Sequence, residues 1–196
     1  MINIENYKQE ELTTNPKTTH LSGFLYPLPF VTIFFIFYYL VWDMPNLKSP
    51  FLFLQDNFGN VSILVLLLIL FISIVLHELI HGLTLVNFVS NGSKSIKYGF
   101  NLKYFVPFCT GKEAMQIKHY IIGLLMPAII LGFNPCIIAT IIQSSGFLVY
   151  GIIMTFAGGG DFIITKLLIN EPKTDFVLDH PSKVGCYIYR LKKCNY

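Results

Sequence analysis

Four long apolar stretches constrain the fold of this chain more than any other feature of its sequence. They cover about residues 22–42, 61–88, 120–142 and 147–169. A helix needs about 20 consecutive apolar residues to cross the hydrocarbon core of a bilayer, and it pairs its own backbone polar groups there. The composition agrees, because 54% of the residues are hydrophobic and 13% are charged. A soluble domain has fewer hydrophobic and more charged residues. We therefore predict an all-α membrane protein with four transmembrane helices.

The connections between these stretches predict a single domain. The last two are separated only by residues 143–146, Gln-Ser-Ser-Gly, which suits a tight turn between antiparallel helices. The first stretch is too long and too poorly flanked for a cleaved signal peptide, so we expect it to be a retained span. No internal repeat or low-complexity linker is visible in the sequence. We assign residues 1–196 to one integral membrane domain.

Basic residues predict the orientation of the helices, because cytoplasmic loops near membrane ends are enriched in lysine and arginine. Two segments carry most of them, the loop between the second and third spans and the C-terminal tail: Lys94, Lys97, Lys103, Lys112, Lys118, and Lys173, Lys183, Arg190, Lys192, Lys193. We therefore expect a multi-pass protein of the cell membrane with cytoplasmic N- and C-termini. The net charge of +3 then reflects topology, and the sequence offers no patch or motif for a nucleic-acid partner.

The second apolar stretch contains His77-Glu78-Leu79-Ile80-His81, a motif that indicates a zinc-dependent peptidase. Residues four apart share one face of an α-helix, so both imidazoles can bind one Zn²⁺ ion with Glu78 beside its open coordination position. The preceding residues, 61–76, contain only Ser62 and Ser73 as polar side chains. Ionisable side chains in lipid are costly and functional by default, which favours a metal site over polar groups satisfied inside a helix bundle.

A third zinc ligand is expected downstream, and depth in the bilayer selects Asp161. His77 lies sixteen residues after the outer end of its span at Val61, and Asp161 lies fourteen residues after Phe147. At about 1.5 Å per residue the two depths differ by about 3 Å. A carboxylate at this depth needs a partner, and a divalent cation is a stronger one than Lys166 on the same helix. The other downstream candidates begin at or beyond the cytoplasmic surface: Glu113, His119, Glu171, Asp175, Asp179 and His180.

Three consecutive glycines, Gly158 to Gly160, come directly before Asp161. Such a run lets another helix approach closely, or lets the backbone loosen near a metal. Small residues also pack membrane helices without any functional role. The sequence leaves both interpretations open for the glycines, although packing alone does not explain Asp161.

Residues 96–106 alternate in polarity with a period of two, which predicts a short amphipathic β-strand or hairpin at the cytoplasmic surface. A helical substrate hides its carbonyl groups in its own hydrogen bonds and must be unwound before cleavage. An edge strand can hold the unwound substrate by strand addition, with Tyr98, Phe100, Leu102 and Tyr104 on one face. The alternative is an interfacial strand that only covers the helix bundle.

The chain resembles the site-2-protease-like intramembrane zinc metallopeptidases, and more closely a family of small four-span proteins described as zincin peptidases. The resemblance covers most of the chain from the second span onward. It rests on residues 77–82 (HELIHG), 104–109 (YFVPFC), the glycine-rich approach to Asp161, and 179–185 (DHPSKVG). It implies a Zn²⁺ cofactor bound by His77, His81 and Asp161, and cleavage of substrates inside or beside the membrane.

The chain departs from the site-2 protease pattern around its aspartate and its oxyanion contact. That family carries the aspartate in an Asn-Pro-Asp-Gly or Leu-Asp-Gly element, whereas Asp161 follows glycines and precedes Phe162. Its Gly-Pro-x-x-Asn element, whose asparagine helps to bind the reacting carbonyl, aligns near residues 126–130 and leaves Ile130 in place of the asparagine.

Two further residues are candidates for supporting roles. Asn134 is a substitute for the missing oxyanion contact, or it satisfies backbone groups freed by Pro135. His180 is a candidate for a contact behind the metal ligands or for gating, although a His-Pro dipeptide is most often a turn.

These features predict a zinc-dependent peptidase that cleaves membrane-associated protein substrates in or next to the lipid bilayer. Zinc acidifies its bound water and polarises the peptide carbonyl, and Glu78 is expected to accept the proton of that water as the general base. The alternatives are a non-catalytic zinc-binding membrane regulator, which has no need of Glu78, and a proton or ion pathway, which the lack of an inverted repeat disfavours.

Overall fold

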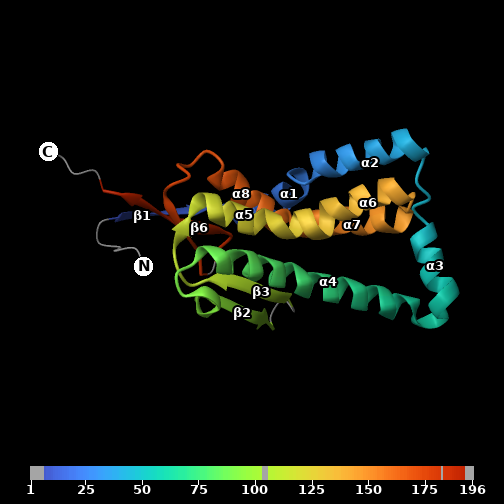
Figure 1. Ribbon diagram of the computed structural model, residues 1–196, viewed down its shortest axis with the longest axis horizontal. Helices are drawn as coiled ribbons and strands as arrows, with labels where there is room; N and C mark the ends of the chain where they lie inside the picture. Colours follow the sequence, from blue (N-terminus) through green and yellow to red (C-terminus); the bar gives the residue numbers. More distant parts are fainter. Residues whose placement is uncertain (1–6, 103–105, 182, 193–196) are drawn as a thin grey trace.

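The structure, a computed structural model, describes residues 7–102, 106–181 and 183–192. It is a bundle of long helices with small β-sheets at one end (Figure 1). The helices are α1 (Pro16–Leu25), α2 (Leu28–Trp42), α3 (Ser49–Phe58), α4 (Ser62–Leu85), α5 (Ile117–Pro127), α6 (Asn134–Ile142), α7 (Ser145–Ala157) and α8 (Gly159–Leu168). The strands are β1 (Tyr7–Thr13), β2 (Ile96–Asn101), β3 (Val106–Gly111), β4 (Met115–Gln116), β5 (Phe176–Asp179) and β6 (Gly185–Leu191).

Three continuous helical segments are long and apolar enough to cross a membrane: Thr19–Trp42, Ser49–Phe88 and Ile117–Ile142. Helices α7 and α8 pass the same test only together, because they meet at a bend of 51°. The four predicted apolar segments are therefore helical, and the fourth is broken rather than straight. Helix α3, which we did not predict, crosses the end of the bundle between α2 and α4 (Figure 1).

The turn between α6 and α7 has the predicted position and a clear chemical basis. Gln143 ends α6 in the left-handed conformation, with φ 56° and ψ 42°. Ser144 caps α7, because its side chain accepts a hydrogen bond from the backbone N–H of Phe147. A left-handed residue at a helix end and a serine cap at a helix start are common terminators of membrane and soluble helices alike. The two helices therefore pack side by side as an antiparallel pair (Figure 1).

A four-stranded antiparallel sheet joins the two ends of the chain, with the order β1-β6-β5-β4. The prediction of an all-α protein is wrong in this respect. The sequence does not predict this sheet, because the pairing of β1 with β6 joins segments far apart in the chain. The sheet lies at the end of the bundle opposite α3 (Figure 1). It contributes Val177, Cys186 and Ile188 to a core that also contains Leu85 of α4 and Tyr120 of α5. This core fixes the ends of α4 and α5 relative to each other.

Strands β2 and β3 form a separate two-stranded antiparallel sheet, the hairpin that the alternating pattern predicts. The hairpin packs along the last turns of α4 (Figure 1). Its close approach depends on Gly82, because a Cβ atom there would collide with the ring of Tyr98. Gly82, which follows the His77–His81 motif, thus allows the hairpin to pack closely against α4.

Candidate metal centre

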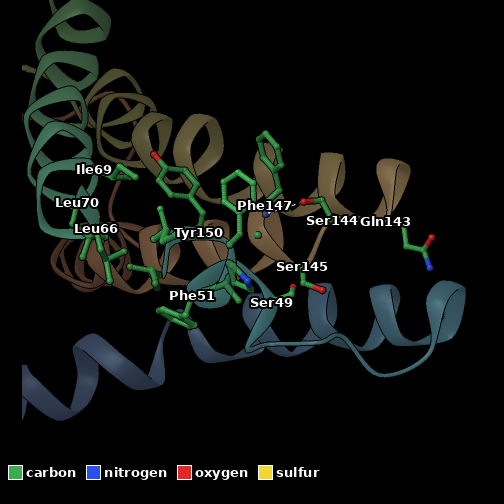
Figure 2. Close-up of a pocket in the computed structure, with 16 residues that line it drawn as sticks. Ser49, Phe51, Leu66, Ile69, Leu70, Gln143, Ser144, Ser145, Phe147 and Tyr150 are labelled. Atoms are coloured by element: carbon green, nitrogen blue, oxygen red, sulfur yellow. Dashed lines mark hydrogen bonds between the residues drawn. The ribbon is translucent and has the colours of Figure 1, made fainter. Parts of the chain in front are cut away.

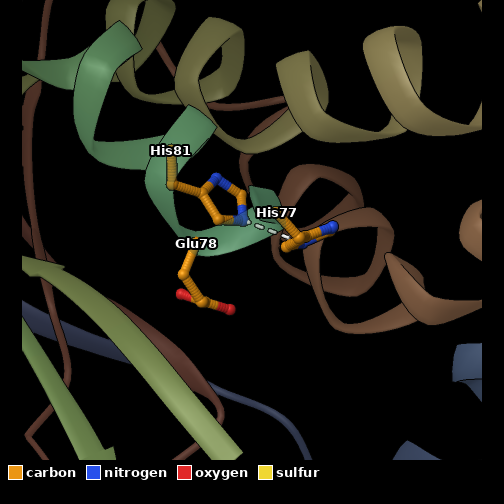
Figure 3. A group of neighbouring side chains, drawn as sticks. All are labelled: His77, Glu78 and His81. Atoms are coloured by element: carbon orange, nitrogen blue, oxygen red, sulfur yellow. Dashed lines mark hydrogen bonds between the residues drawn. The ribbon is translucent and has the colours of Figure 1, made fainter. Parts of the chain in front are cut away.

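Two imidazoles of α4 face each other in the interior of the protein. His77 and His81 are four residues apart, so they lie on one face of the helix, and each is only 7% exposed. Their Nε2 atoms are 3.1 Å apart. Figure 3 shows both rings turned to the same point beside α4.

Asp161 of α8 completes this cluster. Its Oδ2 atom lies 3.0 Å from Nε2 of His77, and its Oδ1 atom lies 3.3 Å from Nε2 of His81. After the bend, α8 packs against α5 and α1, and Asp161 lies in its first turn. Gly159 permits this course, because α1 packs against it so closely that a Cβ atom would collide with the backbone of Gly23.

One hydrogen bond fixes the tautomer of the His81 ring. Its Nδ1 lies 2.9 Å from the carbonyl oxygen of Gly123 in α5, an acceptor that requires a proton on Nδ1. Nε2 of the neutral ring therefore presents a lone pair to the cluster, the arrangement typical of metal-binding histidine. Nδ1 of His77 is buried and has no hydrogen-bond partner among the described residues.

The two Nε2 atoms and the two carboxylate oxygens of Asp161 have a spacing close to that of a tetrahedral zinc site. Bond lengths of about 2.0–2.1 Å place neighbouring ligand atoms about 3.3 Å apart, and the observed separations are 3.0, 3.1 and 3.3 Å. Two neutral imidazoles and a carboxylate direct lone pairs at one point, which is unfavourable unless a proton or a cation lies between them. Two nitrogen donors and one oxygen donor form a ligand set that zinc accepts, so these residues fit Zn²⁺.

Glu78 lies next to the cluster on the adjacent face of α4. One ligand atom from each of His77, Glu78 and His81 lies within 4.8 Å of the others, so this trio can also approach a metal ion. Asp161 lies within 3.3 Å of both imidazoles, so its carboxylate could also bind a metal ion held by them. The Glu78 carboxylate instead points away toward the hairpin (Figure 3), where the backbone N–H of Cys109 donates to it.

A family model described as "Putative zincin peptidase" matches residues 70–176, a stretch that includes the three residues of this cluster and Glu78. The chain belongs to this family. Searches of curated proteins and of solved structures gave no match. The zincin description agrees with the His-Glu-His group on α4, and it implies zinc as the metal.

The hairpin turns toward Glu78 a backbone edge that pairs with no other strand among the described residues. The backbone N–H of Lys112 donates to Ser95, and hydrogen-bonded pairs alternate along an antiparallel ladder, so residues 107, 109 and 111 of β3 turn their backbone groups away from β2. Three observations agree with this register. Residue 107 is a proline without an N–H, Cys109 donates to Glu78, and Gly111 donates to Asp179. The strand that contacts Glu78 is therefore β3, and β2 pairs with the opposite edge of β3.

Asp179 at the end of β5 connects three elements of the site. Its Oδ2 accepts a hydrogen bond of 2.9 Å from the backbone N–H of Gly111, and its Oδ1 accepts one from the hydroxyl of Tyr120 in α5. Burial raises the pKa of the Asp179 carboxyl group, and the bonds from Tyr120 and Gly111 act in the opposite direction. We did not predict this contact, because it depends on a sheet that has no local signal in the sequence.

The residues with predicted supporting roles lie at different distances from the cluster. Asn134 begins α6 and is exposed, and the described contacts do not connect it to the imidazoles. His180 lies beyond β5, where its Nδ1 accepts from the backbone of Lys183 and its ring packs on Tyr187. His180 thus lies next to the four-stranded sheet, and the neighbouring Asp179 is the residue that contacts β3 and α5.

The predicted substrate strand divides between described and undescribed residues. Tyr98 and Phe100 lie on β2, the outer strand of the hairpin, and Leu102 follows it with 83% of its surface exposed. Tyr104 lies outside the described residues.

The other third-ligand candidates have partners of their own. Glu113 accepts hydrogen bonds from Ser90, Asn91 and Ser95. Glu171 and Asp175 pair with Arg190. His119 stacks on Phe88.

An apolar groove of about 890 Å³ lies between α3, α4 and α7, next to the turn at residues 143–146 (Figure 2). Leu70 of α4 lines it and lies about two turns before His77. Tyr150 also lines the groove, and its hydroxyl lies 3.0 Å from that of Ser73, which links α7 to α4. The groove is therefore a separate feature beside the first half of α4, and the described residues that line it include no member of the metal cluster.

Proposed function

We propose that this chain is a zinc-dependent peptidase that hydrolyses membrane-associated protein substrates inside or beside the lipid bilayer. The observation that carries the proposal is the convergence of His77, His81 and Asp161 within 3.3 Å, with the Glu78 carboxylate beside them. The membership in the zincin family supports the same chemistry. The long apolar helices that hold the cluster support a substrate in the membrane.

Each side chain has a distinct task in this proposal. His77, His81 and Asp161 hold the metal, and the carbonyl of Gly123 keeps the His81 ring in the metal-binding tautomer. A zinc ion held there polarises the scissile carbonyl and makes a water molecule acidic enough to lose its proton near neutral pH. Glu78 accepts that proton and then delivers it to the leaving amine. The N–H of Cys109 orients the Glu78 carboxylate for both transfers.

We propose that the edge of β3 that faces away from β2 holds the substrate as an added strand. The backbone carbonyl groups of Pro107 and Cys109 lie on this edge, on the side of Glu78, and can accept hydrogen bonds from the peptide while the N–H of Cys109 stays bonded to Glu78. A peptide paired with this edge is extended, so its carbonyl groups are released from helical hydrogen bonds and one of them can reach the metal. This refines the predicted role of the hairpin, with β3 as the pairing strand and Tyr98 of β2 as its support on α4.

The test compares cells that carry the wild-type chain, Glu78→Gln or the control Glu10→Gln. Glu10 lies on β1, where it pairs with Arg190. Mass spectrometry of new N-termini in the membrane fraction measures cleavage, and elemental analysis of the purified chains measures zinc. We expect all three chains to bind zinc, and Glu78→Gln to lose cleavage by about a hundredfold or more, because an amide cannot accept the proton.

Equal fragments from wild type and Glu78→Gln would contradict the peptidase and leave the zinc-binding regulator. Loss of fragments in the Glu10→Gln control would also count against it, since the effect would then not be specific to the base.

A further inference from the structure

Asp179 bonds to two elements that each hold a part of the proposed active site. Gly111, which donates to Asp179 Oδ2, lies two residues from Cys109 on the same edge of β3. Tyr120, which donates to Asp179 Oδ1, lies three residues before Gly123 on α5. Cys109 contacts the base Glu78, and Gly123 contacts the ligand His81. One carboxylate therefore connects the supports of both groups.

The hairpin needs such a tie, because a two-stranded sheet is at best marginally stable alone. Strand β3 pairs along one edge with β2, and among the described residues no strand pairs with its other edge. The side chain of Asp179 takes one donor of that edge and leaves the groups at residues 107 and 109 facing Glu78. It thus joins the hairpin to the four-stranded sheet without covering the part of the edge that the substrate would use.

We propose that Asp179 is a positioning residue that sets the register and distance of β3 relative to Glu78 and the metal ligands. This inference rests on the proposed peptidase function for its purpose. Asp179 acts through β3 and α5, since its own oxygen atoms are bonded to Gly111 and Tyr120 rather than to the metal cluster. Because Asp179 belongs to β5, the position of β3 then also depends on the four-stranded sheet that contains β1 and β6.

Two replacements separate the two bonds. Asp179→Ala removes both acceptors, whereas Tyr120→Phe removes the hydroxyl and keeps the buried ring. Asp179→Asn is the conservative variant, because its amide oxygen can accept from Gly111 and its amide N–H can donate to the Tyr120 oxygen. Tyr189→Phe is the matched control, since it removes a hydroxyl from β6 in the same sheet.

Hydrogen exchange of the full chain in lipid nanodiscs, followed by mass spectrometry, measures the position of β3 without any substrate. We expect Asp179→Ala to speed exchange in residues 106–111 by about tenfold or more, with residues 185–191 and the zinc content unchanged. Tyr120→Phe should give a smaller change in the same segment. Asp179→Asn and Tyr189→Phe should match the wild type.

Unchanged exchange in residues 106–111 for both Asp179→Ala and Tyr120→Phe would overturn the proposal. Equal acceleration in β3 and in residues 185–191 would also overturn it, because Asp179 would then only stabilise the sheet. The fragment yield gives a second readout, which should fall about tenfold or more with Asp179→Ala and recover with Asp179→Asn. The exchange result does not depend on cleavage, so a failure of the peptidase proposal in the Glu78→Gln test is distinguishable from a failure of this one.

Discussion

Nδ1 of His81 lies 2.9 Å from the carbonyl oxygen of Gly123, and this contact exists because α4 and α5 pack without a side chain between them. A Cβ atom at Gly123 would collide with the side chain of Leu85 on α4. The helices would then have to separate, and the carbonyl would move away from the imidazole. The tautomer of His81 that turns the lone pair of Nε2 toward His77 and Asp161 thus depends on a glycine of another helix.

We therefore expect Gly123→Ala to weaken zinc binding by about tenfold to a hundredfold, as the loss of a partner behind a ligand does. The forced repacking should also lower the free energy of unfolding by about 1–3 kcal/mol. Competition with a calibrated chelator measures the affinity. Gly146→Ala is the control, because a Cβ atom there meets only ordinary contacts at 3.7 and 3.8 Å. Unchanged affinity in Gly123→Ala would show that the contact is dispensable.

The glycines before Asp161 should respond in opposite ways to the same substitution. A Cβ atom at Gly159 would collide with the backbone of Gly23, whereas nothing lies within 4 Å of one at Gly160. Gly159→Ala should lower the free energy of unfolding by about 1–3 kcal/mol. Gly160→Ala should leave it unchanged or raise it by about 0.5–1 kcal/mol, since alanine favours a helix. Thermal unfolding in detergent tests the pair, and equal effects would contradict the packing described for α1 and α8.

The sequence predicts the parts of this fold that depend on local pattern. Apolar runs predict the long helices, the period of two at residues 96–106 predicts a strand or hairpin where β2 and β3 lie, and residues 143–146 predict the turn between α6 and α7. The depth estimate also placed Asp161 at the level of His77, and the structure brings the two side chains to 3.0 Å. Counting residues gives the relative depth of two side chains because two apolar helices that begin at the same surface rise by the same distance per residue.

The remaining features come from contacts between distant segments. The sheet that pairs Tyr7 with Leu191 joins the polar strand β1 to the seven-residue strand β6, and neither has an apolar pattern long enough to predict the pairing. The contacts of Asp179 with Gly111 and Tyr120 depend on that sheet. The bend before Asp161 has a glycine signal, but glycines alone do not separate a bend from close packing.

The buried thiol of Cys186 should make stability decline at alkaline pH. Burial, with smaller effects from Asp179 and Glu171, raises its pKa in the folded protein to about 12. An unfolded cysteine has a pKa of about 8.5, so above that pH the unfolded chain binds fewer protons than the folded chain, and the free energy of unfolding falls as the pH rises. Thermal unfolding at about pH 7 and about pH 9.5 should show a smaller decline for Cys186→Ala than for wild type. Equal declines would contradict the raised pKa.

The predicted orientation in the membrane can be tested with introduced cysteines. Native Cys109 is a poor reporter, because burial raises the pKa of its thiol to about 12 and slows its reaction. Lys94→Cys, in a chain whose native cysteines are replaced by alanine, gives an exposed thiol in the loop before the hairpin. We expect it to react with a membrane-impermeant reagent only after cells are permeabilised.

Asn57→Cys on α3 is the matched reporter for the opposite surface and should react in intact cells. Labelling of Lys94→Cys in intact cells would reverse the topology. It would not affect the zinc assignment, since the relative depth of His77 and Asp161 is the same in either orientation.

The zinc content of the purified full chain, with and without Asp161, tests the central claim most directly. We predict about one zinc ion per chain in the wild type, and its loss in His77→Ala, His81→Ala and Asp161→Ala. His119→Ala should keep the metal, because that imidazole stacks on Phe88 away from the cluster. Stoichiometric zinc in the Asp161→Ala protein would contradict the account, because the metal would then be held without the carboxylate that the bent α7–α8 pair brings to the two imidazoles.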